Sequence, residues 1–70
     1  MGWHVRYMDL GLDHEMLSRE FSTRDEALED AWALAQHRDK KILAIEGPDE
    51  EILPMEDIEA WFEKRSRRKT

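Results

Sequence analysis

The sequence predicts a small α+β domain in which two hairpins form a four-stranded antiparallel sheet accompanied by two helices. Three patterns predict this fold class: alternation of apolar and polar residues near the N-terminus, a capping box followed by helical apolar spacing, and a short run that is apolar at every position. A chain of 70 residues has room for one hydrophobic core, because each ordered residue costs about 1.5 kcal/mol of conformational entropy. We expect the order strand, strand, helix, strand, strand, helix.

The first hairpin is predicted from segment 3–8, where large apolar residues alternate with polar ones as in a strand with one buried face. The Gly and Asp residues of segment 9–13 are typical of a chain reversal. A second strand over 14–21 completes the hairpin. The side chains expected to face the core are Trp3, Val5, Tyr7, Leu17 and Phe21.

The first helix begins with the clearest local signal in the chain. Thr23 is placed to accept a hydrogen bond from the amide of Glu26, whose carboxylate reaches back to the cap amide, and this reciprocal pair forms a capping box. Apolar residues then follow at the spacing of one helix face, so this helix is expected to lie on the sheet. The apolar stripe consists of Ala27, Leu28, Ala31, Trp32, Leu34 and Ala35.

The third and fourth strands are predicted from the segment after this helix. Residues 42–45 are apolar at every position, as expected of an interior strand covered on both faces. Residues 47–50 are expected to form a turn in which Pro48 fixes φ at the second position, and residues 51–53 a short strand that ends at Pro54. The third strand is expected beside the first, in the order 2-1-3-4, because this order makes the wholly apolar strand an interior one.

The second helix is expected to begin at Pro54, with acidic residues in its first turn and basic residues at its end, as the helix dipole favours. It either covers the second face of the sheet or packs against another copy of the protein. Aromatic-rich patches are enriched at interfaces, so the apolar face of this helix is also a candidate protein interface. That face consists of Met55, Ile58, Trp61 and Phe62.

Charge divides the chain into an acidic domain at residues 1–63 and a basic C-terminal tail at residues 64–70. The net charge of the chain is −6, with 11 basic and 17 acidic side chains, and the tail holds five of the basic ones. The domain therefore carries −11 and the tail +5. An acidic domain repels nucleic acid. Contact with nucleic acid, the alternative to a protein interface, therefore depends on the tail. The residues of that alternative are Lys64, Arg65, Arg67, Arg68 and Lys69.

Residues 21–28 read F-S-T-R-D-E-A-L and resemble the F-x-T-x-x-E-A helix start of small bacterial ββαββ domains of unknown function. The resemblance spans residues 3–53, since the strands at 3–5 and 42–45 stand where that family has them. It implies the fold and almost no chemistry. Members commonly have Asp-Gly in the last hairpin, where this chain has Pro-Asp-Glu at 48–50. A second resemblance, to HicB-type antitoxins through T-x-x-E-A at a helix start, implies a toxin protein as partner.

The sequence indicates no catalytic residues, no cofactor site and no metal site. It has no cysteine, no histidines at ligand spacing and no G-x-S-x-G context for a serine nucleophile. The carboxylates at 49–51 and 56–59 are explained by a solvated turn and a helix N-terminus. Residues 1–12 lack a signal-peptide pattern, and no apolar run is long enough to cross a membrane. We therefore expect a non-catalytic, cytoplasmic protein that binds itself or another protein, with a nucleic-acid-associated regulator as the alternative. The first resemblance implies a bacterial source.

Overall fold

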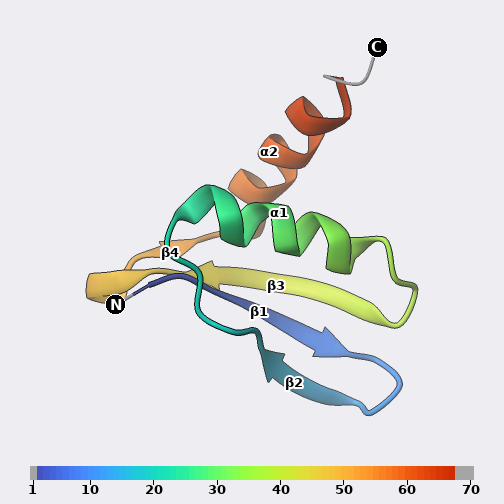
Figure 1. The fold of residues 1–70 in the computed structure, drawn as a ribbon. Helices are drawn as coiled ribbons and strands as arrows, with labels where there is room; N and C mark the ends of the chain where they lie inside the picture. Colours follow the sequence, from blue (N-terminus) through green and yellow to red (C-terminus); the bar gives the residue numbers. More distant parts are fainter. Residues whose placement is uncertain (1, 68–70) are drawn as a thin grey trace.

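The computed structural model describes residues 2–67, which form a four-stranded sheet and two helices (Figure 1). In chain order the elements are β1 (His4–Asp9), β2 (His14–Leu17), α1 (Arg24–Ala35), β3 (Lys40–Glu46), the 3-10 turn η1 (Pro48–Glu50), β4 (Ile52–Leu53) and α2 (Met55–Arg67). The strands pair antiparallel in the order β2-β1-β3-β4. This confirms the predicted α+β fold class and strand order, and it makes β3 an interior strand.

The core lies between the sheet and the two helices. Ile45 of β3, Leu28 of α1 and Ile58 of α2 are each at most 1% exposed and belong to one cluster. Burying a side chain of this size stabilises the fold by about 1.5–3 kcal/mol. The small side chains of Ala27 and Ala31 let α1 approach the sheet closely, and both are fully buried. The other members of the cluster are Val5, Phe21 and Ile42.

α1 begins at the predicted capping box. The Thr23 Oγ1 atom accepts a hydrogen bond from the Glu26 amide at 3.2 Å, and Glu26 Oε1 accepts one from the Thr23 amide at 3.3 Å. These bonds satisfy donors that the helix leaves without an intrahelical acceptor, which is why the helix begins at Arg24. Ala35 is the last residue of the helix and is exposed. The apolar stripe that contacts the core therefore ends before Ala35, which was predicted to belong to it.

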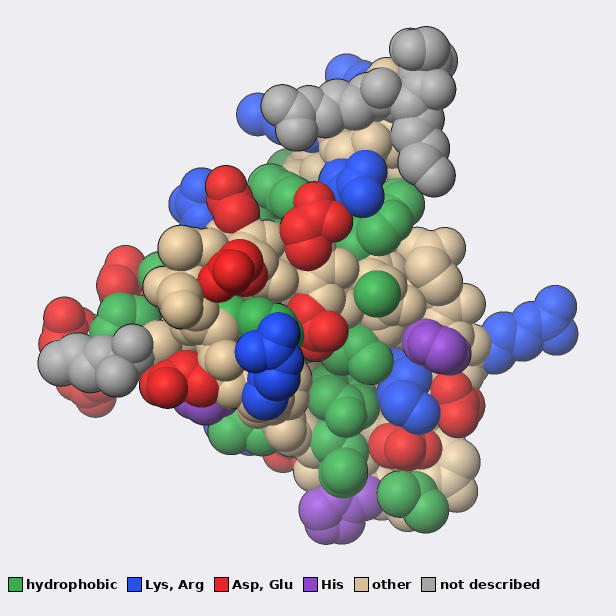
Figure 2. All heavy atoms as spheres, in the orientation of Figure 1, with side chains coloured by type: hydrophobic (Ala, Val, Ile, Leu, Met, Phe, Trp, Pro, Cys, Tyr) green, Lys and Arg blue, Asp and Glu red, His purple; other side chains and the backbone are tan. Residues whose placement is uncertain are grey.

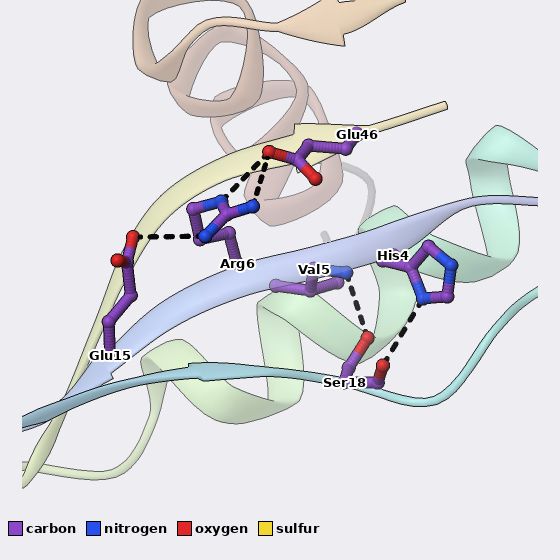
Figure 3. Close-up of polar contacts among 6 residues, drawn as sticks. All are labelled: His4, Val5, Arg6, Glu15, Ser18 and Glu46. Atoms are coloured by element: carbon purple, nitrogen blue, oxygen red, sulfur yellow. Dashed lines mark hydrogen bonds and ion pairs between the residues drawn. The ribbon is translucent and has the colours of Figure 1, made fainter. Parts of the chain in front are cut away.

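Both helices pack on the same face of the sheet, which corrects the expectation that the C-terminal helix covers the second face. The Trp32 ring of α1 meets the Phe62 ring of α2 edge to face, with centroids 5.3 Å apart, and Figure 1 shows both helices above the sheet. The physical reason lies on the opposite face, where Arg6 is ion-paired with Glu15 and Glu46 (Figure 3). An apolar helix placed there would take these charges out of water, which is costly.

A β-bulge decides which residues of β3 face the helices. The register of β1 against β3 shifts between Arg6 and Tyr7, where β3 has one additional residue. Because of this additional residue, Ile42 and Ile45 both face the helices. Arg6 and its partner Ala44 lie on the other side of the sheet. We call this side the open face, because no helix or strand of residues 2–67 covers it. The expectation that β3 is covered on both faces is therefore wrong for the described chain.

β2 is shorter than predicted, and its register against β1 shifts after Leu17. The Val5 amide donates to the Ser18 Oγ atom at 2.8 Å (Figure 3), so a side chain takes the place of a backbone carbonyl in the ladder. Leu17 pairs with Arg6 on the open face and is 49% exposed, which corrects its predicted place in the core. Phe21 lies beyond the shift and is buried in the core as predicted.

The last hairpin turns through two residues with positive φ. Asp49 has φ 56° and Glu50 has φ 63°, and the Glu51 amide donates to the Pro48 carbonyl at 3.1 Å. Two consecutive left-handed residues inside this hydrogen bond make a type I′ turn, a form whose twist suits a tight hairpin. Pro48 therefore stands at the first position of the turn and not at the predicted second.

Candidate functional site

The candidate interface residues of α2 lie largely in intramolecular contacts. Ile58 is fully buried and belongs to the core, which corrects its predicted place at an interface. Met55 and Phe62 are partly buried and pack against the same core. Trp61 also packs against the core, but in addition it lines a groove on the surface. Of these four residues, Trp61 is the one that the structure places at a candidate site.

The groove lies between α2, the first turns of α1 and β4. It encloses about 240 Å³, and a neighbouring hollow of about 270 Å³ continues it. Because the two share Arg24, Trp61 and Lys64, we treat them as one site and call it the α2 groove. Its other lining residues are Leu28, Leu53, Asp57 and Ala60 in the first hollow, and Asp25 and Arg65 in the second.

A series of aromatic contacts orients Trp61. Its ring meets the Phe62 ring at a centroid distance of 6.1 Å and an angle of 68°, and Phe62 meets Trp32 at 5.3 Å and 73°. Edge-to-face pairs of this kind contribute about 0.5–1.5 kcal/mol beyond the area that they bury. The Trp61 ring is therefore positioned by the fold before any ligand arrives.

Arg65 joins the two helices in the second hollow of the groove. Its Nε atom lies 3.1 Å from Glu29 Oε2 of α1, and its guanidinium carbon lies 5.8 Å from the centroid of the Trp32 ring. Both contacts are within the molecule, so the charge of Arg65 is largely compensated. Arg65 therefore links α1 to α2 at the groove.

Arg24 reaches the groove because the capping box makes it the first residue of α1. Reasoning from the sequence missed this residue. The helix dipole disfavours a cation in the first turn of a helix. The unfavourable position of Arg24 is therefore the sequence signal that could have identified it as a candidate. The Nε atom of Arg24 lies 3.8 Å from Asp25 Oδ1, and both side chains are more than half exposed, so water screens the pair strongly.

The predicted basic tail is in part a continuation of α2. The helix extends through Arg67, which is ion-paired with Glu63 one turn earlier, whereas Arg68 and Lys69 lie outside the described residues. Lys64 is exposed and forms no ion pair with another residue in the range 2–67. Figure 2 shows basic and acidic side chains intermingled over the helices. The structure thus brings Lys64 to the groove and gives Arg67 a carboxylate partner.

Polarity changes along the α2 groove. Asp57 and Lys64 both line it and are seven residues apart on α2, a separation of about 10 Å along the helix axis. Trp61 lies between them, and Leu53 adds apolar surface from β4. An extended peptide advances about 3.3 Å per residue, so the groove has the length of a segment of roughly three residues. It can hold an apolar side chain against Trp61 and a carboxylate beside Lys64.

A second polar cluster lies at the centre of the open face. Arg6 contacts Glu46 Oε2 at 2.7 Å and Glu15 Oε1 at 3.3 Å. Figure 3 shows the guanidinium of β1 between a carboxylate of β2 and one of β3. Hydrogen bonds to Glu46 and then Glu15 raise the pKa of Arg6, so its positive charge is kept and is compensated across three strands.

A third cluster fastens the tip of the first hairpin. The Leu12 amide donates to Asp9 Oδ1 at 3.1 Å, and Lys40 Nζ lies 3.3 Å from Asp9 Oδ2. The hydrogen bond from Leu12, together with the contact to Lys40, lowers the pKa of Asp9, and the contact with Asp9 raises the pKa of Lys40. The two side chains are only 14% and 20% exposed, and their contact links β1 to β3.

Comparisons with protein-family models, curated proteins and solved structures find no match for this chain. Among the described residues, no group of three or more His, Asp or Glu side chains is placed to hold a metal ion. Within the same range, neither helix is long and apolar enough to cross a membrane. The candidate site therefore rests on the geometry of the α2 groove.

Proposed function

We propose that this protein is a non-catalytic binding module that holds a short acidic segment of a partner protein in the α2 groove. One observation carries the proposal: the oriented ring of Trp61 stands with two cations, Arg24 and Lys64, in one groove of a chain whose net charge is −6. The ring favours a large apolar side chain in the bound segment, and the cations favour a carboxylate next to it.

The expected affinity is modest. Burial of one large apolar side chain against Trp61 and its neighbours supplies about 1.5–3 kcal/mol. Each exposed charge contact, to Arg24 or Lys64, adds about 0–1 kcal/mol. Because these contributions sum to at most about 5 kcal/mol and association itself is costly, we expect a dissociation constant of about 1 mM or weaker for a short peptide.

A short acidic segment matches the charge distribution better than nucleic acid does. Double-stranded DNA carries a negative charge about every 1.7 Å along its axis, so it would extend from the groove over the carboxylates of an acidic domain. Moreover, Arg65 and Arg67, which belong to the nucleic-acid alternative, are each ion-paired within the molecule. A short segment instead places its charge at Arg24 and Lys64.

The test is an NMR titration of the full isotope-labelled chain with the capped peptide Asp-Asp-Leu-Phe-Glu. We expect shifts of the Trp61 indole and of the first turn of α1, while the Trp3 indole, which packs on Gly47 away from the groove, stays unchanged. Arg24→Glu replaces an attraction by a repulsion and changes the binding free energy by about 1–2 kcal/mol. The dissociation constant should therefore rise about fivefold to thirtyfold.

Arg38→Glu is the matched control, because it makes the same change of charge at an exposed residue that does not line the groove. It should change the dissociation constant by less than about twofold. Equal losses in the two variants would contradict binding in the groove. Two other outcomes would overturn the proposal: equally tight binding of a peptide with Lys in place of each acidic residue, or tighter binding of a short single-stranded DNA, which would favour the nucleic-acid-associated regulator.

A further inference from the structure

The open face exposes apolar side chains from its outer strands. Cross-strand partners project to the same side of a sheet. Leu17 and Ala44 both pair with Arg6 and therefore lie on the open face, as does Ile52, which pairs with Glu46. Leu17 is 49% and Ile52 64% exposed. Apolar surface on a sheet that the described chain leaves uncovered is what a second protein surface would bury.

The charged side chains of the open face sum to zero. Arg6 and Lys41 are balanced by Glu15 and Glu46, whereas residues 1–63 as a whole carry −11. Two copies of so acidic a domain repel each other over most of their surface. The open face is a surface across which two copies can meet without net repulsion.

The same face is self-complementary. Met8 pairs with Glu15 on one side and with Lys41 on the other, so an acidic and a basic residue lie at one level on either side of β1. A two-fold axis parallel to β1, between two stacked sheets, places β2 of each copy over β3 of the other. It thereby brings Glu15 of each copy opposite Lys41 of the second copy, and Leu17 opposite Ala44. Arg6 lies at the axis and faces Arg6 of the second copy, and the ion pairs of each Arg6 with Glu15 and Glu46 offset this like-charge contact.

We propose that the open face is a self-association surface on which two copies pack their sheets face to face about this axis. Strands lie about 4.8 Å apart and the longest strand, β3, has seven residues, so the face measures at most roughly 19 Å by 23 Å and is narrower at the short strands β2 and β4. This area is less than about half of the roughly 800 Å² that each partner contributes to a standard interface. The dimer is therefore weak, with a dissociation constant on the order of 100 μM.

Sedimentation equilibrium of the full chain, from about 10 μM to about 1 mM, tests the proposal. Leu17→Lys places a charge in the apolar part of the face and should leave the chain monomeric throughout. Leu10→Lys is the matched control, because Leu10 is 52% exposed but lies in the loop between β1 and β2. It should dimerise like the unchanged chain. A monomer at the highest concentration, or a dimer that Leu10→Lys disrupts and Leu17→Lys does not, would overturn the proposal.

A charge swap tests the two-fold arrangement itself. Glu15→Lys alone creates two like-charge contacts per dimer, one on each side of the axis, and also removes the ion pair with Arg6 within each copy, so it should weaken association about tenfold. Adding Lys41→Glu restores both contacts with their signs exchanged and should recover most of the loss. Failure of the double variant to recover, with both proteins folded by circular dichroism, would refute the axis. Arg24→Glu, in the α2 groove, should leave dimerisation unchanged, so this result is independent of peptide binding.

Discussion

Replacing Glu50 by Gly should stabilise the domain, because the backbone at this position is left-handed. Glu50 has φ 63° and an exposed side chain. A left-handed conformation costs an L-residue about 1–2 kcal/mol, whereas glycine adopts it freely but loses about 0.5–1 kcal/mol more conformational entropy on folding. The net stabilisation is about 0.5–1 kcal/mol, which raises Tm by about 2–8 °C in a domain of this size.

Thermal and urea unfolding, followed by circular dichroism, measure this effect. Glu51→Gly is the matched control, because it removes the same charge from the next residue, whose φ of −68° and ψ of 137° suit any amino acid. Glycine brings only the entropic loss at that position and should destabilise the domain by about 0.5–1 kcal/mol. The loss of one negative charge is common to both variants and cancels in their difference. Equal effects, or a lower Tm for Glu50→Gly, would refute the assignment of strain to Glu50.

Three further predictions concern the contacts that hold the fold. Ile58→Ala leaves a cavity in the core and should lower the free energy of unfolding by about 2–5 kcal/mol in urea titrations; a loss below about 1 kcal/mol would contradict full burial. Thr23→Ala removes the helix cap and should cost about 1 kcal/mol, while Thr23→Ser should cost little; equal losses in unfolding experiments would argue against the cap. The folded pKa of Asp9 is lowered, so the stability that it contributes is present above its unfolded pKa of about 4 and is lost as the pH falls through the folded pKa. Unfolding measured at a series of acidic pH values should therefore decline less steeply for Asp9→Asn, and an unchanged slope would show that Asp9 is not the group responsible.

Local patterns were sufficient to predict the elements of the fold. The capping box at Thr23 and Glu26 depends on residues within one helical turn, and it forms as the sequence indicates. The apolar run at 42–45 predicted an interior strand, and the strand order follows from that requirement. Each of these features depends on interactions within a short segment of the chain, so each could be predicted from the sequence alone.

The side of the sheet that α2 covers depends on competition between two faces. One face offered apolar partners on α1, including Trp32, and the other presented Arg6 with its two carboxylates. The alternation of His4 and Arg6 with apolar residues in β1 contained this signal, because it marks one face as polar. The outward position of Leu17 was harder to predict, since it follows from a register shift that a side-chain hydrogen bond of Ser18 produces.

The α2 groove combines residues that the sequence suggested for different functions. Trp61 was a candidate for a protein interface and Lys64 for nucleic-acid contact, and the 3.6-residue period places both on one side of α2. Arg24 joins them from a helix that begins about 40 residues earlier in the chain. Only the packing of α2 beside α1 brings the three together, and that packing could not be deduced while the sheet's second face was a possible site for α2.

The two proposed surfaces lie on opposite sides of the sheet, which affects how partners would bind. The α2 groove is on the side of the helices, so face-to-face association through the open face leaves the grooves of both copies accessible. A partner that carries two acidic segments on a flexible linker would then bind more tightly than one segment, by up to about a hundredfold if the linker spans both grooves. Leu17→Lys, which keeps the chain monomeric, should leave the affinity for the single peptide unchanged and abolish this gain. A gain that persists in the monomeric variant would show that both segments bind one copy, and would contradict the assignment of one groove to each.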